Sequence, residues 1–443
     1  MLISDFHLKI NLNIFSQCNI FKTVSLFTSV RKYIFTICSR RNMRSLLATT
    51  MMLLMMTAAL AGCAGSDVTQ DDVDQARAEG LAEGIAQATT VSTLDVIHER
   101  GSMNCGVKSE QWGMGYLNTD SEYTGLDVEY CKAIAAAIGL NPETDVTYVY
   151  SSGSERFNLL RDSEIDVLIR TTTWTTSRDA DLNADFAGIN FYDGQAILVN
   201  GEKLANDGTP SVYDMGGASI CVATGTTTEG NIQDFISDWD ESWGATPTAF
   251  VADDATAARA AFVGGECDAY TGDNSAMAAY KWQLDGEGGA TECAMKQADG
   301  TTCVDLWIGA EYLSKEPLTA AVRDYDTEWK EVVQWVWFGM VTAEEMGLTS
   351  TNLDSAPTDS ATTRFLTGSS WLGTEANPLD ADFMTDVLTA VGNYGEAYDR
   401  SFCDGTYDGT SGSDEMSGCV LPRAGTENAL VSEGGLMYAP AWR

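Results

Sequence analysis

The chain has 443 residues, of which 26 are basic and 64 acidic, so its formal net charge is −38. A phosphate backbone requires a basic footprint, and this balance therefore excludes a nucleic-acid-binding protein. Hydrophobic residues make up 44% and aromatic residues 9%, which is ordinary for a folded protein and too high for a disordered acidic chain. The two histidines are His7 and His98, which excludes a histidine-rich metal site. We expect no metal and no cofactor.

Basic residues are concentrated at the N-terminus. Residues 1–62 carry seven basic residues and one acidic residue, whereas the rest of the chain carries 19 basic and 63 acidic residues, a net charge of −44. From Met43 the chain shows a charged start, an apolar centre at 51–60 and small residues before Cys63, which is the pattern of a secretory signal. We expect residues 1–42 to be an over-long start and residues 43–62 to be the signal peptide.

The four residues from Leu60 to Cys63, Leu-Ala-Gly-Cys, resemble a bacterial lipobox, in which the cysteine is acylated and becomes the new N-terminus. An ordinary signal peptide with a chance cysteine is the alternative. Residues 63–93 contain no aromatic residue and are typical of an acidic tether. No later apolar run is long enough to span a bilayer, so we expect membrane contact only through the lipid at Cys63.

The cysteines after Cys63 are even in number, which in an exported chain indicates disulfides. None has the CxxC spacing of a redox or metal motif. Many connectivities are open, and nearest-neighbour pairing would give four local loops. The eight residues are Cys105, Cys131, Cys221, Cys267, Cys293, Cys303, Cys403 and Cys419.

Short β-like runs alternate with helical ones from about residue 94. The first unit has predicted strands at 103–107, 146–150 and 165–170 and helices at 127–139 and 154–162. The pattern then restarts with strands at 219–223, 247–251 and 267–271 and helices at about 228–239, 255–263 and 274–282. Buried strands that alternate with amphipathic helices predict mainly parallel sheets covered on both faces.

Two extended segments, 195–199 and 305–310, are candidates for crossings between these units. Helical stretches predicted at 318–340 and 380–398 would return the chain to the first unit. Residues 404–418 are predicted to form a loop. The resulting prediction is an α/β protein with a cleft between two lobes. Lobe 1 would comprise residues 94–198 and 311–443, including a C-terminal extension, and lobe 2 residues 199–310.

A hydroxyl-rich turn, residues 170–178, follows the predicted strand 165–170 and ends at Arg178. Ligands bind at the carboxyl ends of parallel strands because main-chain N–H groups are free there. Arg178 could then bind a carboxylate bidentately. The alternative is a capped helix start with a solvated arginine.

A second turn, residues 225–229, has a glycine followed by three threonines and opens the helix after strand 219–223. Such a turn offers N–H donors to an anion. Asp273, after strand 267–271, would stand at the same strand edge and suit a ligand ammonium, although a helix N-cap is the alternative. A carboxylate site on one lobe and an ammonium site on the other predict recognition of an α-amino acid.

The sequence resembles the extracytoplasmic solute-binding proteins of polar amino-acid ABC transporters, specifically the general L-amino-acid-binding branch. The resemblance spans residues 94–443. The matching stretches are 105–107, 124–131, 154–157, 166–168 with the turn to Arg178, 220–229, 267–273, 314–318, 390–396 and 434–440.

The resemblance implies the two-lobed type II fold of periplasmic binding proteins and a set of ligand-binding residues. Arg178 would bind the α-carboxylate and Asp273 the α-ammonium. Arg156 would meet the ligand side chain, with a surface ion pair as the alternative, and Trp112 would cover the ligand, with a core tryptophan as the alternative. The remaining donors to the carboxylate would be Thr171, Thr173, Thr227 and Thr228.

The resemblance also implies a function. We expect a monomeric, lipid-anchored receptor, in the periplasm or on the outer face of the cytoplasmic membrane. It would close on a free L-amino acid, polar or of broad range, and deliver it to the permease of an ABC transporter. It would not be an enzyme. The alternative is a cyclohexadienyl or arogenate dehydratase-like enzyme on the same fold.

Overall fold

The computed structural model describes residues 91–206, 208–285, 293–368, 371–403, 405 and 418–443. The expected over-long start, the signal peptide, Cys63 and the tether up to residue 90 lie outside these ranges, as does most of the predicted loop 404–418. Among the helices in the described ranges, none combines the length and the hydropathy that crossing a bilayer requires.

Lobe 1 is built on three parallel strands, in which β1 lies between β5 and β6. The strands are β1 (Met103–Val107), β5 (Val146–Tyr150) and β6 (Val167–Leu168). A small antiparallel sheet accompanies them, formed by β2 (Glu110–Gln111), β3 (Gly115–Leu117) and β4 (Tyr123–Thr124). The helices of this lobe are α4 (Thr93–Arg100), α5 (Leu126–Ala137), α6 (Arg156–Arg161), α7 (Thr176–Asp181) and α11 (Thr327–Glu345).

Lobe 2 repeats this plan, with β8 parallel to both β9 and β10. Its strands are β8 (Ser219–Ala223), β9 (Thr248–Ala252), β10 (Ala269–Asp273) and β11 (Leu306–Ile308). Its α-helices are α8 (Thr227–Ser237), α9 (Ala255–Val263) and α10 (Asn274–Asp285). Three-residue 3-10 turns lie at Val212–Asp214 and Glu241–Trp243 in this lobe and at Leu353–Ser355 and Val431–Glu433 in the C-terminal part.

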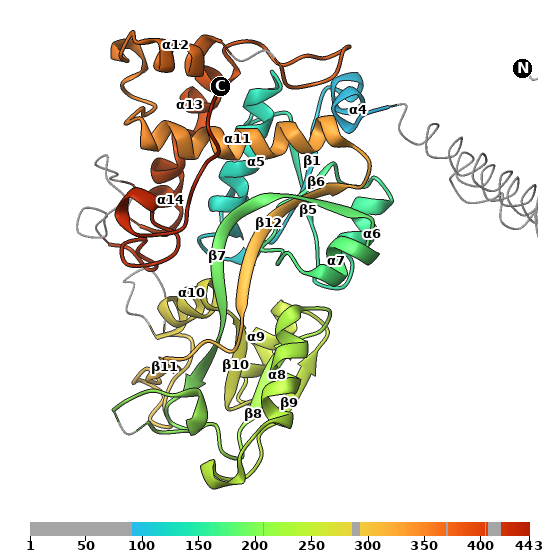
Figure 1. Cartoon of the computed structure of the whole chain (residues 1–443). Helices are drawn as coiled ribbons and strands as arrows, with labels where there is room; N and C mark the ends of the chain where they lie inside the picture. The colour runs from blue at the N-terminus through green and yellow to red at the C-terminus, as the bar shows by residue number, and fades with distance from the viewer. Residues whose placement is uncertain (1–90, 207, 286–292, 369–370, 404, 406–417) are drawn as a thin grey trace, which may run out of the picture. The chain divides into compact units, whose positions relative to one another are not determined.

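Two long antiparallel strands join the lobes (Figure 1). Strand β7 (Ala184–Asn200) pairs with β12 (Lys315–Arg323) up to Gly194, and from Gln195 it pairs with β10 and then also β11. The sheet order is therefore β5-β1-β6-β12-β7-β10-β8-β9, with β11 also on β7. Because β7 runs without interruption through both lobes, it crosses the boundary that we predicted after residue 198.

The predicted helix at 318–340 was wrong in its first part. Residues 318–323 belong to β12, and α11 begins at Thr327. Strand β12 lies between β6 and β7, and its residues from Leu318 to Val322 are all buried. A strand that is buried on both faces has no alternation of polar and apolar residues, so its pattern does not distinguish it from a buried helix. The second crossing also differs from the prediction, which placed it at 305–310. Strand β11 lies in that segment but stays in lobe 2, and the chain crosses between the lobes after it.

The C-terminal extension packs on lobe 1. Its helices are α12 (Ser360–Thr367), α13 (Phe383–Val391) and α14 (Tyr394–Phe402); α13 and α14 lie beside α5 and α11, and α12 packs on α13 (Figure 1). The single helix predicted at 380–398 is divided because Gly392 has a φ of 74° and Asn393 caps α14. Apolar residues of the extension join the core of lobe 1, so the extension is part of that folded unit.

Four disulfides join cysteines that are neighbours along the chain. They link Cys105 to Cys131, Cys221 to Cys267, Cys293 to Cys303 and Cys403 to Cys419. The first connects β1 with α5 and the second joins the middle of β8 to the turn before β10, so each lies within one lobe. The structure thus has no disulfide between the lobes among its described residues.

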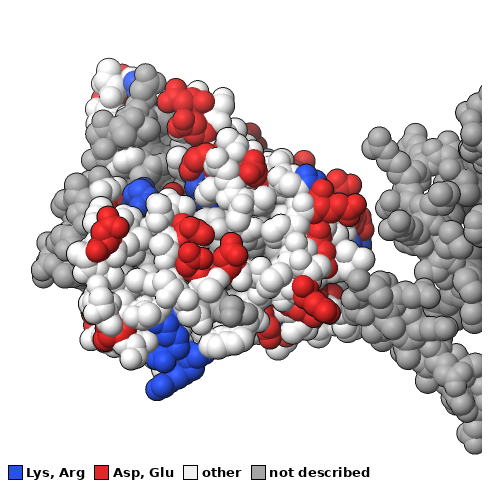
Figure 2. Space-filling model, turned by 90° about the horizontal axis from the view of Figure 1, so that it is seen from above, with Lys and Arg blue, Asp and Glu red and all other residues white. Residues whose placement is uncertain are grey.

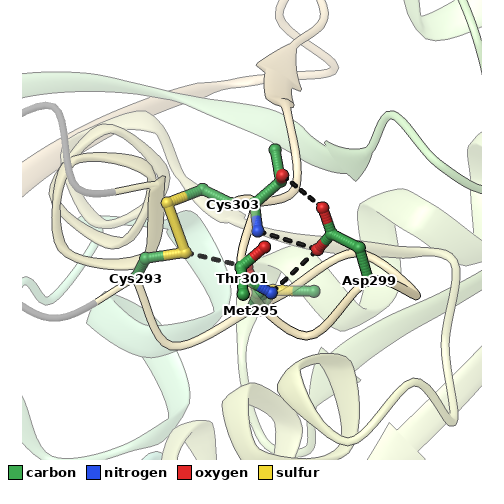
Figure 3. Close-up of a disulfide and its surroundings, with 6 residues drawn as sticks. Cys293, Met295, Asp299, Thr301 and Cys303 are labelled. Atoms are coloured by element: carbon green, nitrogen blue, oxygen red, sulfur yellow. Dashed lines mark hydrogen bonds between the residues drawn. A yellow bond between two sulfur atoms is a disulfide. The ribbon is translucent and has the colours of Figure 1, made fainter.

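The loop closed by the third disulfide is ordered by one aspartate (Figure 3). The carboxylate of Asp299 accepts hydrogen bonds from the main-chain N–H groups of Thr301 and Thr302, at 2.8 Å each, and from the Thr302 hydroxyl. These hydrogen bonds lower the pKa of Asp299 well below its ordinary value. Asp299 is therefore ionised at neutral pH, where its carboxylate holds this turn.

Acidic side chains are spread over the surface. On the face shown in Figure 2, Asp and Glu form several separate groups, whereas Lys and Arg gather at fewer places. Such a surface keeps a protein hydrated, and salt screens its self-repulsion.

Candidate ligand-binding site

A pocket lies where the two lobes face each other, and residues of both lobes line it. From lobe 1 it receives residues that follow β1 and β6, such as Lys108 and Arg170. From lobe 2 it receives residues at the ends of β8, β9 and β10, such as Ala223, Asp254 and Asp273. All of these positions are at or just after the carboxyl end of a strand, the edge at which open α/β sheets bind ligands.

The lobe 1 side of the pocket is the turn that follows β6. Thr171 has a φ of 45°, which is a strained conformation for a β-branched residue. Its N–H donates to Oδ2 of the buried Asp127 at 3.1 Å, and this bond helps to hold the turn in place. Thr175 then caps α7, and Nη1 of the buried Arg178 donates to the Thr173 carbonyl at 2.8 Å. The guanidinium of Arg178 is thereby fixed at the pocket wall.

The lobe 2 side is the start of α8. The Thr226 hydroxyl accepts from the Glu229 N–H at 3.0 Å and caps the helix, so the first turn of α8 faces the pocket with Thr227 and Thr228. Gly225 has a φ of 71°, and a side chain there would come within about 3.1 Å of the Ser154 backbone of lobe 1. The lobes approach closely at this point, and Nη2 of Arg156 donates to the Gly225 carbonyl at 3.4 Å.

The cationic side chains of the pocket all come from lobe 1. They are Lys108, Arg156, Arg170 and Arg178, and all four are buried. Burial lowers the pKa of Lys108 to about 8 and that of Arg178 to about 10, and it also lowers the pKa of Arg156, to which the charges of Arg170 and Arg178 contribute. Like charges this close together favour an anion between them.

Several polar atoms at the pocket wall have no hydrogen-bond partner among the described residues. They are Nε of Arg156, Nε of Arg170 and Oγ1 of Thr171, and each is buried. A buried donor without a partner costs free energy, so an unpaired group at a pocket wall is suited to a ligand atom.

The anionic side of the pocket is formed at the end of β10. Asp273 lines the pocket, and Asp193 of β7 lies close enough for the two carboxylates to influence each other. Loss of surrounding water raises the pKa of both, and the neighbouring carboxylate raises that of Asp193 further. Two adjacent carboxylates attract a cation, which would relieve their repulsion.

Seven of the eight ligand-binding residues predicted from the sequence line this single pocket. They are Arg156, Thr171, Thr173, Arg178, Thr227, Thr228 and Asp273. The exception is Trp112, which does not line the pocket. Its ring packs against Trp282 of α10 at a centroid distance of 4.5 Å and against Phe402 of α14 at 6.4 Å. In this structure Trp112 packs at the boundary between the lobes, next to the pocket residues but not among them, and its role toward a ligand stays a prediction.

Four residues of the site region were missed by sequence reasoning. Lys108 and Arg170 each stand at the end of a parallel strand, which is the signal that identified the other residues, and it could have found them. Asp193 and Glu316 lie in the two crossing strands β7 and β12. No local pattern places these two near the pocket.

The pocket therefore presents cations from lobe 1 and a carboxylate from lobe 2 to one small space, an arrangement that fits a zwitterion. Among the described residues, no group of three or more His, Cys, Asp or Glu could hold a metal ion.

Residues 103–349 match the bacterial extracellular solute-binding proteins, family 3. The chain belongs to this family, as the sequence indicated. It is 37% identical over 365 residues to the glutamate/glutamine/aspartate/asparagine-binding protein BztA of Rhodobacter capsulatus, a match that covers 82% of this chain and 97% of the relative. It is 35% identical over 369 residues to the general L-amino acid-binding periplasmic protein AapJ of Rhizobium johnstonii, covering 82% and 96%.

A solved relative confirms the two-lobed α/β fold class. It is an ABC transporter periplasmic binding protein from Brucella ovis with glutathione bound, which has a TM-score of 0.67 and 35% identity and covers 80% of this chain and 100% of its own. These relatives are binding proteins and not enzymes, so the dehydratase alternative finds no support in them.

Proposed function

We propose that this protein captures a free L-amino acid between its two lobes and delivers it to the permease of an ABC transporter. The observation that carries the proposal is that Arg178 and Asp273, which belong to opposite lobes, line one pocket. A zwitterion bound there would contact both lobes at once, so ligand binding would favour the closed arrangement.

The roles follow from charge and position. Arg178 binds the α-carboxylate, because its guanidinium is fixed at the pocket wall by the Thr173 carbonyl. The threonines of the two turns complete the carboxylate's surroundings, Thr171 with its unpartnered hydroxyl and Thr173, Thr227 and Thr228 with main-chain N–H groups. Asp273 binds the α-ammonium, supported by the neighbouring charge of Asp193.

The remaining cations favour ligands whose side chain carries a carboxylate or an amide. Once Arg178 is engaged, Lys108, Arg156 and Arg170 still line the pocket, and two of them have an unpartnered buried Nε. A carboxylate offers two acceptor oxygens to such donors. The name of the Rhodobacter relative, which lists four acidic or amide amino acids, agrees with this preference.

The setting of the protein is part of the same proposal. Acylation of Cys63 would anchor it by a lipid in the periplasm or on the outer face of the cytoplasmic membrane, with the segment up to residue 93 as a tether. Delivery to a permease is supported by the description of the Brucella relative as an ABC transporter binding protein. We expect the protein to act as a monomer.

A thermal-shift screen of the purified protein against the twenty amino acids tests the proposal, because a ligand that binds the folded state raises its apparent stability by mass action. Glutamate, glutamine, aspartate and asparagine should raise the melting temperature most, and calorimetric titration should then give one site per chain. Glutathione should be included because it is bound in the Brucella relative. If no amino acid shifts the melting temperature, the proposal is wrong.

A further inference from the structure

Glu316 has a buried carboxylate that accepts hydrogen bonds from residues of both lobes. Its side chain is 1% exposed and does not line the pocket. Its Oε2 accepts hydrogen bonds from the hydroxyls of Thr173, at 2.6 Å, and Thr227, at 2.7 Å. Its Oε1 accepts from Nδ2 of Asn231, at 3.0 Å, and from the Ser314 hydroxyl, at 2.5 Å.

These donors come from three parts of the fold. Thr173 belongs to the turn after β6 in lobe 1, whereas Thr227 and Asn231 belong to α8 in lobe 2. Ser314 precedes β12, the crossing strand that carries Glu316. One oxygen of one carboxylate thus joins hydroxyls of the two lobes, whose oxygens are 3.4 Å apart. If the lobes separated, this oxygen would lose at least one of its two donors.

The same bonds decide which donors face a ligand. A threonine hydroxyl has one proton to donate. In this arrangement the protons of Thr173 and Thr227 are given to Glu316, so these hydroxyls cannot also donate to a ligand carboxylate. The Thr226 hydroxyl donates to the Ala223 carbonyl, so the Thr228 hydroxyl, 2.8 Å from it, donates to Thr226. That leaves the guanidinium of Arg178, the hydroxyl of Thr171 and main-chain N–H groups.

We propose that Glu316 is a positioning residue that fastens the two lobes together in the closed arrangement through Thr173, Thr227 and Asn231, by contacts that include no ligand atom. This interlobe fastening is distinct from the ligand contacts of the proposed function, although its effect on affinity rests on that function. A carboxylate acceptor makes each of these bonds charge-assisted and therefore stronger than a bond between neutral groups.

The consequence for binding follows from population arithmetic. Apparent affinity is reduced by the fraction of protein that is not in the binding-competent form. If Glu316 holds a large fraction closed or nearly closed, less of the ligand's binding free energy is spent on closure. Loss of Glu316 should then open the ligand-free protein and weaken binding to every amino acid by the same factor.

The experiment measures closure without any ligand. Ketone-bearing amino acids replace two exposed residues, Asp181 at the end of α7 and Gln233 in α8, and each carries a spin label. The distance between the two labels reports the separation of the lobes, and this chemistry leaves the cysteines untouched. We expect a mainly short distance in the otherwise unchanged protein and a shift of population to longer distances in Glu316→Ala. Asn231→Ala should give a smaller shift in the same direction, because it removes one interlobe bond and does not alter the pocket lining.

Ser314→Ala is the matched control, because it removes a hydrogen bond to the same carboxylate that comes from the crossing segment and not from α8. It should leave the distances unchanged. A circular-dichroism melt shows that each variant is folded, and Asn231→Ala keeps the test valid if Glu316→Ala does not fold. Equal distances in the parent protein, Glu316→Ala and Asn231→Ala would overturn the proposal, as would a parent protein that is already open. If the distances respond as expected but no amino acid binds, the fastening stands and the proposed function fails.

Discussion

Asp193 and Asp273 occupy adjacent strands at the point where β7 passes from one lobe to the other. Asp273 is paired in the ladder with Gln195, two residues beyond Asp193, and the N–H of Ser275 donates to Asp193 at 3.2 Å. Loss of surrounding water raises the pKa of both carboxyl groups, the charge of Asp273 raises that of Asp193 further, and the charge of Glu316 acts in the same direction on Asp273. The pair therefore retains a proton at a pH at which separate aspartates would be ionised.

This relationship predicts a pH dependence of binding. A ligand ammonium favours the ionised carboxylates, so binding releases a proton and affinity should rise with pH, by up to about tenfold per pH unit as the pH approaches about 8, the value to which the pKa of Asp193 is raised. Lys108, whose pKa is lowered to about 8, acts in the opposite direction, because its loss of charge removes a cation that favours the ionised form of Asp273 and that attracts a ligand carboxylate. Titration calorimetry in buffers of different ionisation enthalpy measures the released proton. Asp193→Asn should flatten the profile, and a profile that stays steep in that variant would count against this account.

Removal of Arg178 should weaken all amino-acid ligands. The Arg178→Ala substitution leaves the α-carboxylate without its main cation in a pocket that excludes much of the water, and the expected loss is about 2 to 5 kcal/mol. Asp273→Ala should have a comparable effect through the ammonium. Calorimetric titration with glutamate, glutamine and alanine checks both variants. Unchanged affinity in Arg178→Ala would remove the basis of the amino-acid site.

Substitution of Arg156 should change selectivity and not general affinity. Arg156→Ala removes a donor whose Nε has no partner among the described residues and leaves Arg178 in place. Glutamate and aspartate should lose about tenfold or more in affinity, which is about 1.4 kcal/mol, whereas alanine should be nearly unaffected. Equal losses for glutamate and alanine in the same titrations would show that Arg156 has a structural role, through its hydrogen bond to Gly225 between the lobes.

The anchor is tested at Cys63. In cells that export and process the protein, Cys63→Ser should release it into the soluble fraction, because the thiol that would be acylated is missing. Fractionation followed by immunoblotting gives the distribution, and the purified variant should bind amino acids as before. A variant that still sediments with membranes would contradict lipidation at this residue.

The C-terminal extension should depend on one buried ion pair. Arg423 is fully buried, and its Nη1 and Nη2 donate to the Glu344 carboxylate at 3.1 and 2.6 Å, while its guanidinium lies 4.7 Å from the Tyr394 ring centre. Arg423→Met leaves a buried carboxylate without this partner and should lower the free energy of unfolding by about 3 to 5 kcal/mol. Chemical denaturation measures the loss. Arg161→Met, which breaks the exposed pair with Asp162, is the control and should cost less than about 1 kcal/mol.

The sequence by itself was sufficient for the elements whose signal is local. Strand β8 and helix α9 were found at their observed bounds, because each combines a run of apolar residues with a clear stop or cap. Most residues of the pocket could also be predicted from a local signal in the sequence. Arg178 and Asp273 could be placed because each follows a strand that the sequence reveals, and the carboxyl ends of parallel strands share one edge.

The tertiary structure alone decided what depends on residues far apart in the chain. Strand β12 was misread as a helix because its neighbours β6 and β7 bury both of its faces, so its alternation disappears. Trp112 faces Trp282 of the other lobe and not the pocket, and Glu316 finds its donors in Thr173 and Thr227. A buried polar side chain forms hydrogen bonds, and a buried aromatic ring packs, with whichever residues the closed lobes bring next to it. Those partners leave no periodic pattern around the residue itself, and only the packed fold identifies them.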